Sequence, residues 1–281
     1  MKQQTWFITG ISSGFGREMT EQLLSSGDRV FGTVRKANTV DDLKRKFGDS
    51  LRVAQLDMTD ISAIEPVVKA AFEAFTSINV VVSNAGYGLF GAAEGLTSEQ
   101  IRHQIDTNLM GPIQLTQSVV PRLRSQGGGH IVAISTYGGQ TAAPGASLYC
   151  ASKWGMEGFF DAISGEIAKF NIGVTIIEPG GARTAFRSTA RANMGVELDA
   201  YKGTPVEMIG TILNNPARLP VGDASKMVKL IIETVKQGYP PKRLVLGSDA
   251  YTAIQKALVE RLASVEKQKE IAFSTDIPAT A

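Results

Sequence analysis

The sequence predicts a single α/β domain built on a doubly wound parallel sheet of about seven strands, with helices on both faces. Short, continuously apolar runs alternate along most of the chain with amphipathic stretches of helical period. This alternation is typical of parallel strands joined by right-handed helical crossovers. A length of 281 residues suits one such domain, and 43% hydrophobic residues can fill its core. The apolar runs, which we expect to be buried strands, lie at residues 6–8, 29–34, 51–56, 78–82, 130–134, 174–177 and 243–246.

Helical patterns fill the intervals between these runs. Residues 64–75 carry apolar side chains at the 3.6-residue period of a helix with one buried face. Thr39, followed by Asp42 three residues later, resembles a capping box and predicts where the helix after the second strand begins. Residues 224–235 give the next helical pattern before the last strand.

Residues 1–281 are expected to form one domain, because no linker or internal repeat divides them. Residues 183–222 break the alternation, and a connection of this length usually contains short helices or acts as a lid over a substrate. The tail, residues 265–281, is polar and is expected to be loosely ordered.

Composition excludes several classes of function. The net charge is +2 and the cations are dispersed, so we expect no nucleic-acid or membrane partner. Cys150 is the only cysteine, which fits a reducing compartment. The apolar start is interrupted too early by Thr9 for a signal sequence, so a cytoplasmic protein is expected. His103 and His130 lack ligand spacing, so we expect no metal site and place both at the surface or on a helix side.

The first predicted strand ends in a glycine-rich turn that opens directly into a helical pattern. Glycines permit a tight turn and a close backbone approach to a pyrophosphate, and the helix N-terminus supplies free amide donors. The alternative is a glycine-rich turn that binds nothing. The candidate cofactor-binding residues of this turn are Gly10, Ser12, Ser13, Gly14, Phe15 and Gly16.

Cofactor choice is expected to depend on the end of the second strand. An acid at this place would bind the ribose hydroxyls and favour NAD. The chain has Arg35 and Lys36 instead, and a guanidinium can hold a phosphate through two parallel hydrogen bonds. We therefore expect NADP(H) to be preferred over NAD(H), although two solvated loop cations would give the same pattern.

Tyr149 and Lys153 begin a helical stretch and stand four residues apart, so they share one helical face. A free phenol has a pKa of about 10 and transfers protons poorly at neutral pH. A neighbouring ammonium would lower the pKa of Tyr149 and make it a usable acid or base.

Together these segments resemble the short-chain dehydrogenase/reductase family over residues 5–184. Residues 9–16 resemble its TGxxxGxG motif, residues 83–86 its NNAG motif, and Tyr149 with Lys153 its YxxxK motif. The resemblance implies a Rossmann-type fold and hydride transfer between a nicotinamide and a carbonyl or alcohol. In the family, helices corresponding to residues 97–125 and 149–169 often build a dimer face, so a homodimer or homotetramer is one expectation, and the sequence does not choose between monomer, dimer and tetramer. Further cofactor contacts implied by the resemblance are Asp57, Asn84, Ala85, Gly86, Tyr149, Lys153, Pro179, Gly180 and Thr184.

The resemblance also implies a catalytic tetrad of Asn108, a hydroxyl residue, Tyr149 and Lys153. The family usually has Ser thirteen residues before the Tyr, and this chain has Thr136 there, with Ser135 one residue earlier. Successive strand residues point to opposite faces, so we assign the hydroxyl role to Thr136 and keep Ser135 as the alternative. Tyr149 would donate or accept the proton, Lys153 would assist it, and Asn108 would anchor a water chain.

The substrate is less clearly specified by the sequence. Tyr87, Tyr137 and Phe186 adjoin the motifs and could line an apolar pocket, or could simply pack. We expect a neutral ketone, aldehyde or secondary alcohol. A catalytically silent dinucleotide sensor, and another reaction on the same scaffold, are the alternatives.

Overall fold

The computed structural model describes residues 3–215, 217–238 and 240–277. Within these residues, seven parallel strands form one sheet in the order β3-β2-β1-β4-β5-β6-β7. The order reverses direction between β1 and β4, which is the place where doubly wound sheets bind ligands. The strands are β1 (Thr5–Ile8), β2 (Arg29–Val34), β3 (Leu51–Gln55), β4 (Val80–Ser83), β5 (Gly129–Ile134), β6 (Ile172–Pro179) and β7 (Arg243–Leu246).

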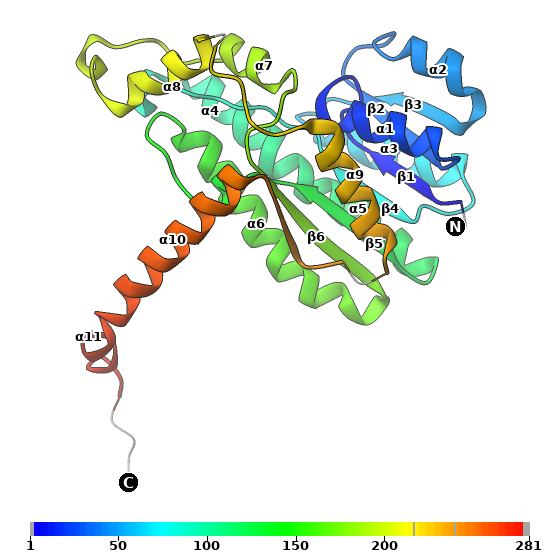
Figure 1. The fold of residues 1–281 in the computed structure, drawn as a ribbon. Helices are drawn as coiled ribbons and strands as arrows, with labels where there is room; N and C mark the ends of the chain where they lie inside the picture. Colours follow the sequence, from blue (N-terminus) through cyan, green and yellow to red (C-terminus); the bar gives the residue numbers. More distant parts are fainter. Residues whose placement is uncertain (1–2, 216, 239, 278–281) are drawn as a thin grey trace.

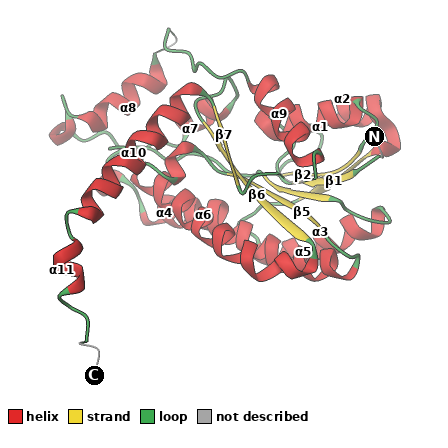
Figure 2. Cartoon of the chain, turned by 60° about the horizontal axis from the view of Figure 1, so that its bottom comes forward, coloured by secondary structure: helices red, strands yellow, loops and turns green. Residues whose placement is uncertain are grey.

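Helices cover both faces of the sheet, which confirms the predicted fold class (Figure 2). The two side-chain faces of β1 show the division: Trp6 packs into one core cluster and Phe7 into the other. The first cluster includes apolar residues of α1 (Gly14–Ser25), α2 (Asp41–Phe47) and α9 (Ala224–Lys236). The second includes residues of α3 (Ile61–Ala74), α5 (Gly111–Ser125) and α6 (Ser147–Ile167). Both faces of the strands are therefore buried, as their continuous apolar runs predict.

The capping box predicted at Thr39 and Asp42 is wrong. Helix α2 begins at Asp41 after Val40, whose side chain is fully buried and occupies the N-cap position without a capping hydrogen bond. The Thr39 hydroxyl instead donates to the backbone oxygen of Lys36 at 3.0 Å. Burial of Val40 sets the start of the helix, so core packing overrides the local capping pattern.

The long connection after β6 contains two helices, α7 (Phe186–Ala192) and α8 (Pro205–Asn214), which lie beyond one end of the sheet (Figure 1). Arg187 joins them, because its guanidinium donates to the backbone oxygens of Leu213 at 3.0 Å and of Asn215 at 2.6 Å. A backbone bridge between Phe90 and Met194 ties the segment to the loop after β4.

The end of the described chain is helical and projects away from the body of the protein (Figure 1). Helix α10 (Ser248–Glu266) is followed by α11 (Lys269–Phe273). Within the predicted loosely ordered tail, residues 265–273 are helical apart from the turn between α10 and α11, and residues 278–281 lie outside the described residues. Within the described ranges, no helix has the length and apolarity needed to cross a membrane.

Candidate active site

The turn after β1 has the geometry of an anion-binding loop. Gly10 and Gly14 have φ angles of 74° and 59°, in the left-handed region that favours glycine. A Cβ on Gly16 would lie 2.2 Å from the Gly10 backbone oxygen, so only glycine lets α1 start this close to the strand. Ser13 is the N-cap of α1 and makes no capping hydrogen bond, which leaves the amides of the first turn available to a phosphate. The loop therefore fits a dinucleotide pyrophosphate.

Asn84 holds this loop in place from the end of β4. Its amide nitrogen donates to the backbone oxygens of Thr9 at 2.8 Å and Gly10 at 3.0 Å. The Thr9 hydroxyl accepts in turn from the backbone amides of Asn84 and Ala85, both at 3.0 Å. The Asn84 side chain is thus engaged within the protein, and its part in the predicted cofactor site is to shape the glycine turn.

Arg35 and Lys36 follow β2 and are exposed. Asp57, after β3, lies near Arg35. Burial opposes ionisation of Asp57, but hydrogen bonds from the Thr59 backbone and hydroxyl, together with the charge of Arg35, hold its pKa below the ordinary value. The ends of β2 and β3 therefore present cations beside an ionised carboxylate, at the same edge of the sheet as the glycine turn.

Tyr149 and Lys153 lie on one face of α6, as predicted; Lys153 is buried and Tyr149 is partly buried. The Lys153 ammonium donates to the backbone oxygen of Ile134 at 2.8 Å. Burial lowers the pKa of Lys153 to about 8, while the charge of Glu157 opposes this change. The expected depression of the Tyr149 pKa is not found: burial raises it, and a hydrogen bond with Thr136 only partly opposes the rise. The Lys153 ammonium is bonded to the Ile134 carbonyl, and burial of the Tyr149 phenol has the largest effect on the pKa of Tyr149.

Thr136 and Ser135 point in different directions from the end of β5. The Thr136 hydroxyl donates to the backbone oxygen of Pro179 at 3.3 Å and interacts with Tyr149. The Ser135 hydroxyl donates to Glu157 Oε1 at 2.5 Å. Thr136 thus faces the phenol, whereas Ser135 faces a buried carboxyl group.

Asn108 lies on a π-helical turn, Asp106–Met110, between α4 (Ser98–Ile105) and α5. Its side chain is fully buried, accepting from the Tyr87 amide at 3.1 Å and donating to the Tyr87 backbone oxygen at 2.8 Å. It also donates to the Ser152 hydroxyl at 3.3 Å. The side chain therefore ties the loop after β4 to α6.

Aromatic rings cover the Tyr149 side chain. The centroid of Phe90 lies 5.4 Å from that of Tyr149, and the centroid of Phe186 lies 5.7 Å from it. Sequence reasoning selected Phe186 but missed Phe90, whose only signal was an aromatic residue four positions after Gly86. The Tyr87 hydroxyl points toward α4, where it pairs with His103 Nδ1 at 2.8 Å. This contact gives no support to the predicted role of Tyr87 in binding the substrate.

The remaining predicted residues lie at the same edge of the sheet. A Cβ added to Gly14 would lie 3.8 Å from the Thr184 Cβ, so Thr184 adjoins the glycine turn. Gly86 packs near both Asn108 and Lys153. Tyr137 is half-buried in the turn after Thr136, and Gly180 follows β6 directly after Pro179.

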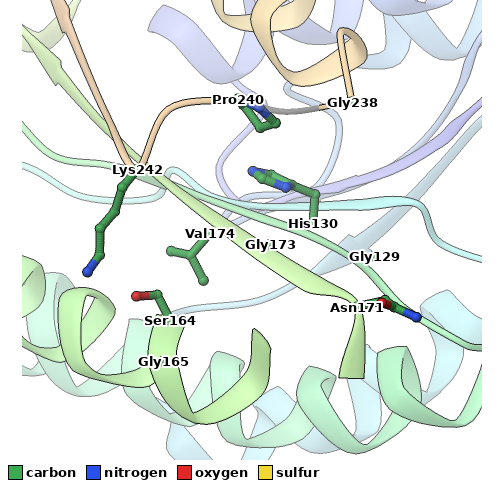
Figure 3. Close-up of a pocket in the computed structure, with 10 residues that line it drawn as sticks. All are labelled: Gly129, His130, Ser164, Gly165, Asn171, Gly173, Val174, Gly238, Pro240 and Lys242. Carbon is green, nitrogen blue, oxygen red and sulfur yellow. The ribbon is translucent and has the colours of Figure 1, made fainter. Parts of the chain in front are cut away.

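A separate hollow of about 460 Å³ lies at the opposite ends of β5 and β6 and contains none of the predicted site residues (Figure 3). His130 reaches into it and pairs with the Thr175 hydroxyl at 3.0 Å. The prediction that His130 lies at the surface or on a helix side is wrong, because it belongs to β5 and its burial lowers its pKa to about 4. Gly238 and Pro240 also line this hollow, and we assign it no function.

The fold and the site define a class of protein, the NAD(P)-dependent oxidoreductases. The chain belongs to the short-chain dehydrogenase family, whose family model matches residues 4–195. It is 35% identical over 271 residues to the Oxidoreductase BOA17 of Botryotinia fuckeliana, covering 96% of this chain and 98% of that protein.

Solved structures support the same membership. A short-chain dehydrogenase from Streptomyces avermitilis is 31% identical and has a TM-score of 0.88, with 98% of this chain and 99% of that chain covered. Two more distant structures share the fold with different cofactors. A short-chain dehydrogenase/reductase from Burkholderia phymatum in complex with NAD has a TM-score of 0.76 at 21% identity and covers 100% and 98% of the two chains. An actinorhodin polyketide ketoreductase with NADPH has a TM-score of 0.72 at 25% identity and covers 88% and 95%.

Proposed function

We propose that this protein is an NADP(H)-dependent carbonyl reductase or alcohol dehydrogenase for a neutral, apolar ketone, aldehyde or secondary alcohol. The observation that carries the proposal is that Tyr149 and the buried Lys153 share one face of α6, near Thr136 at the end of β5 and at the edge of the sheet that also carries the glycine turn. We assign the catalytic roles to Asn108, Thr136, Tyr149 and Lys153.

The substrate oxygen would accept hydrogen bonds from the Thr136 and Tyr149 hydroxyls. NADPH, when bound, supplies the hydride, and Tyr149 donates the proton to the oxygen as negative charge develops. Lys153 provides a positive charge in a buried site, where an ion acts on its neighbours more strongly than in water. Asn108 holds the loop after β4, and with it Gly86, against the helix that carries Tyr149. The chain thus contributes positioning and electrostatic stabilisation.

The preference for NADPH rests on Arg35 and Lys36 at the end of β2, where no acid stands. A 2′-phosphate would bind the Arg35 guanidinium through charge-assisted hydrogen bonds. The apolar character of the substrate rests on Phe90 and Phe186, which cover Tyr149, and on the helices α7 and α8 as a lid. We further propose a cytoplasmic protein, and a homodimer or homotetramer that light scattering would detect.

The test is oxidation of NADPH and of NADH, followed by absorbance, over a panel of ketones and aldehydes. Turnover with NADPH is expected, and Tyr149→Phe should abolish it. Tyr251→Phe is the matched control, because Tyr251 is exposed on α10 and its hydroxyl loss should leave turnover unchanged. Tight binding of NADPH without turnover on any compound would instead favour a dinucleotide sensor. Turnover without net consumption of cofactor would favour an isomerase or dehydratase on the same scaffold.

A further inference from the structure

Two carboxyl groups are buried together directly behind the candidate catalytic hydroxyls. Glu157 comes from α6, one helical turn after Lys153, and is 2% exposed. Glu178 comes from β6, immediately before Pro179, and is fully buried. Arg243 of β7 reaches both, with its Nε 3.2 Å from Glu178 Oε1 and 3.5 Å from Glu157 Oε2. Among the described residues, Arg243 is the one cation within 4 Å of both carboxyl groups, so full ionisation would leave two buried carboxylates with one close cation.

The hydrogen-bond partners of the two groups are unevenly distributed. Glu157 Oε1 accepts from the Ser135 hydroxyl, and Glu178 Oε1 accepts from the Gln140 amide at 2.6 Å and from Arg243. The second oxygen of each carboxyl group is buried and has no hydrogen-bond partner among the described residues. A single proton between the carboxyl groups would make one of them a donor to the other and would satisfy both oxygens.

The cations near the pair are shared with another acid or bonded elsewhere. Arg243 also contacts Asp161 at 3.5 Å, and Lys242 pairs with Asp161, so both cations are shared with a partly exposed acid. Lys153 faces the pair from the preceding turn of α6, and its ammonium is bonded to the Ile134 carbonyl. Burial, followed by the nearby charge of Glu178 and a hydrogen bond with it, raises the pKa of Glu157, while Ser135 and Arg243 oppose the rise.

We propose that Glu157 and Glu178 hold one proton between them, and that this bridged pair positions the residues of the active site. Glu157 fixes Ser135, which precedes Thr136, and Glu178 precedes Pro179, whose carbonyl accepts from the Thr136 hydroxyl. The turn after Thr136 passes directly over the pair, since a Cβ on Gly139 would lie 1.9 Å from Glu157 Oε1. Glu157 and Glu178 act through their neighbours, so they are positioning residues. The catalytic consequence rests on the proposed function, whereas the shared proton does not.

The shared proton is tested by the pH dependence of the melting temperature, without cofactor or substrate. Between pH 6.5 and 8 the folded protein keeps a proton that the unfolded chain has released, so stability falls as pH rises. Glu157→Gln replaces the protonated carboxyl group by an amide, which can donate to Glu178 and accept from Ser135 without titrating. This variant should flatten the fall of the melting temperature with pH. Glu166→Gln makes the same change at an exposed position of α6 and should retain the wild-type slope. A wild-type slope in Glu157→Gln would overturn the shared proton.

A protonated carboxylic acid also has an infrared carbonyl band, which provides a second readout of the same proton. The band should be present in the wild type and in Glu166→Gln at pH 7, and it should disappear in Glu157→Gln. A wild-type spectrum without a buried acid band would likewise overturn the shared proton.

The positioning role is tested by turnover. Glu157→Leu can bond neither Ser135 nor Glu178, and it should lower kcat about ten- to a hundredfold, as expected for a misplacement of catalytic groups. NADPH affinity should stay within about twofold, and Glu157→Gln should restore kcat to within about threefold. If Glu157→Leu does not fold, Ser135→Ala removes one link alone and should lower kcat by a smaller factor. Wild-type kcat in folded Glu157→Leu, or in Ser135→Ala, would overturn the positioning role. A wild type without turnover would contradict the proposed function and leave the pH test intact.

Discussion

Replacement of the two neighbouring hydroxyl residues separates catalysis from stability. Thr136→Val keeps the shape of the side chain and removes the hydroxyl that faces Tyr149. A donor to a developing oxyanion contributes about 10²–10³ in turnover, so kcat should fall by about this factor. Thr136→Val loses two long hydrogen bonds, the one donated to the Pro179 carbonyl at 3.3 Å and the one accepted from the Gly138 amide at 3.4 Å, and their joint net contribution to stability is about 1 kcal/mol. The melting temperature should therefore fall by only about 2–4 °C.

Ser135→Ala should show the opposite balance. It leaves Glu157 Oε1, a buried acceptor, without the hydroxyl that bonds it at 2.5 Å. An unsatisfied buried acceptor costs about 1–3 kcal/mol, so the melting temperature should fall further than in Thr136→Val. Turnover should fall by less than about tenfold, because the hydroxyl does not face Tyr149.

The assay is kcat with NADPH and the best substrate of the panel, together with the melting temperature of each variant by circular dichroism. The double variant should combine a large loss of turnover with the larger loss of stability. A hundredfold loss in Ser135→Ala alongside near-normal turnover in Thr136→Val would refute the assignment and give the catalytic role to Ser135.

Three further predictions concern other parts of the site and the opposite edge of the sheet. The double change Arg35→Gln with Lys36→Gln should raise the KM for NADPH about ten- to a hundredfold, because the two exposed charge-assisted contacts together contribute ~1.5–3 kcal/mol. Steady-state kinetics should show the KM for NADH unchanged, and equal loss with both cofactors would contradict 2′-phosphate recognition. Asn84→Ala should lower the melting temperature by about 4–8 °C and weaken NADPH binding in calorimetry, since the glycine turn loses two hydrogen bonds; unaltered binding would show that the turn does not need this support. Burial holds the folded-state pKa of His130 at about 4, below its unfolded value of 6.5, so the unfolded chain binds the extra proton and stability falls as pH drops from 6.5 to 4. His130→Gln should reduce that acid loss in urea unfolding curves at pH 6.5 and 4.5, and an unchanged loss would mean that His130 does not bind the extra proton on unfolding.

The positions of the strands could be predicted from sequence because buried parallel strands are continuously apolar. Even so, the predicted run 78–82 begins two residues before β4 (Val80–Ser83). Asn79 explains the difference, since its side chain accepts from the Thr5 backbone amide at 2.8 Å instead of continuing the strand. Local polarity of this kind is not visible in an apolar run.

The glycine turn and the Tyr149 helix could also be predicted, because each is a short contiguous motif with its own chemistry. Phe90 and the pairing of Glu157 with Glu178 could not, since they depend on contacts between elements that are distant in the chain. Glu157 stands four residues after Lys153, a spacing that by itself is typical of an ion pair on a helix. Nothing local indicates that β6 and β7 bury it beside a second carboxyl group.

Because of the π-helical turn at Asp106–Met110, the position of Asn108 depends on the number of residues in this helix as well as on their types. A π-turn accommodates one residue more than the α-helical winding on either side of it. Deleting Leu109 would restore regular α-helical winding and remove the widened turn that carries Asn108. Helix α5 would keep its orientation, so Leu115, Val119 and Leu123 would stay in the core cluster that covers the sheet. A substitution in this helix changes one contact at a time, whereas this deletion would remove the turn that holds Asn108 against Tyr87 and Ser152.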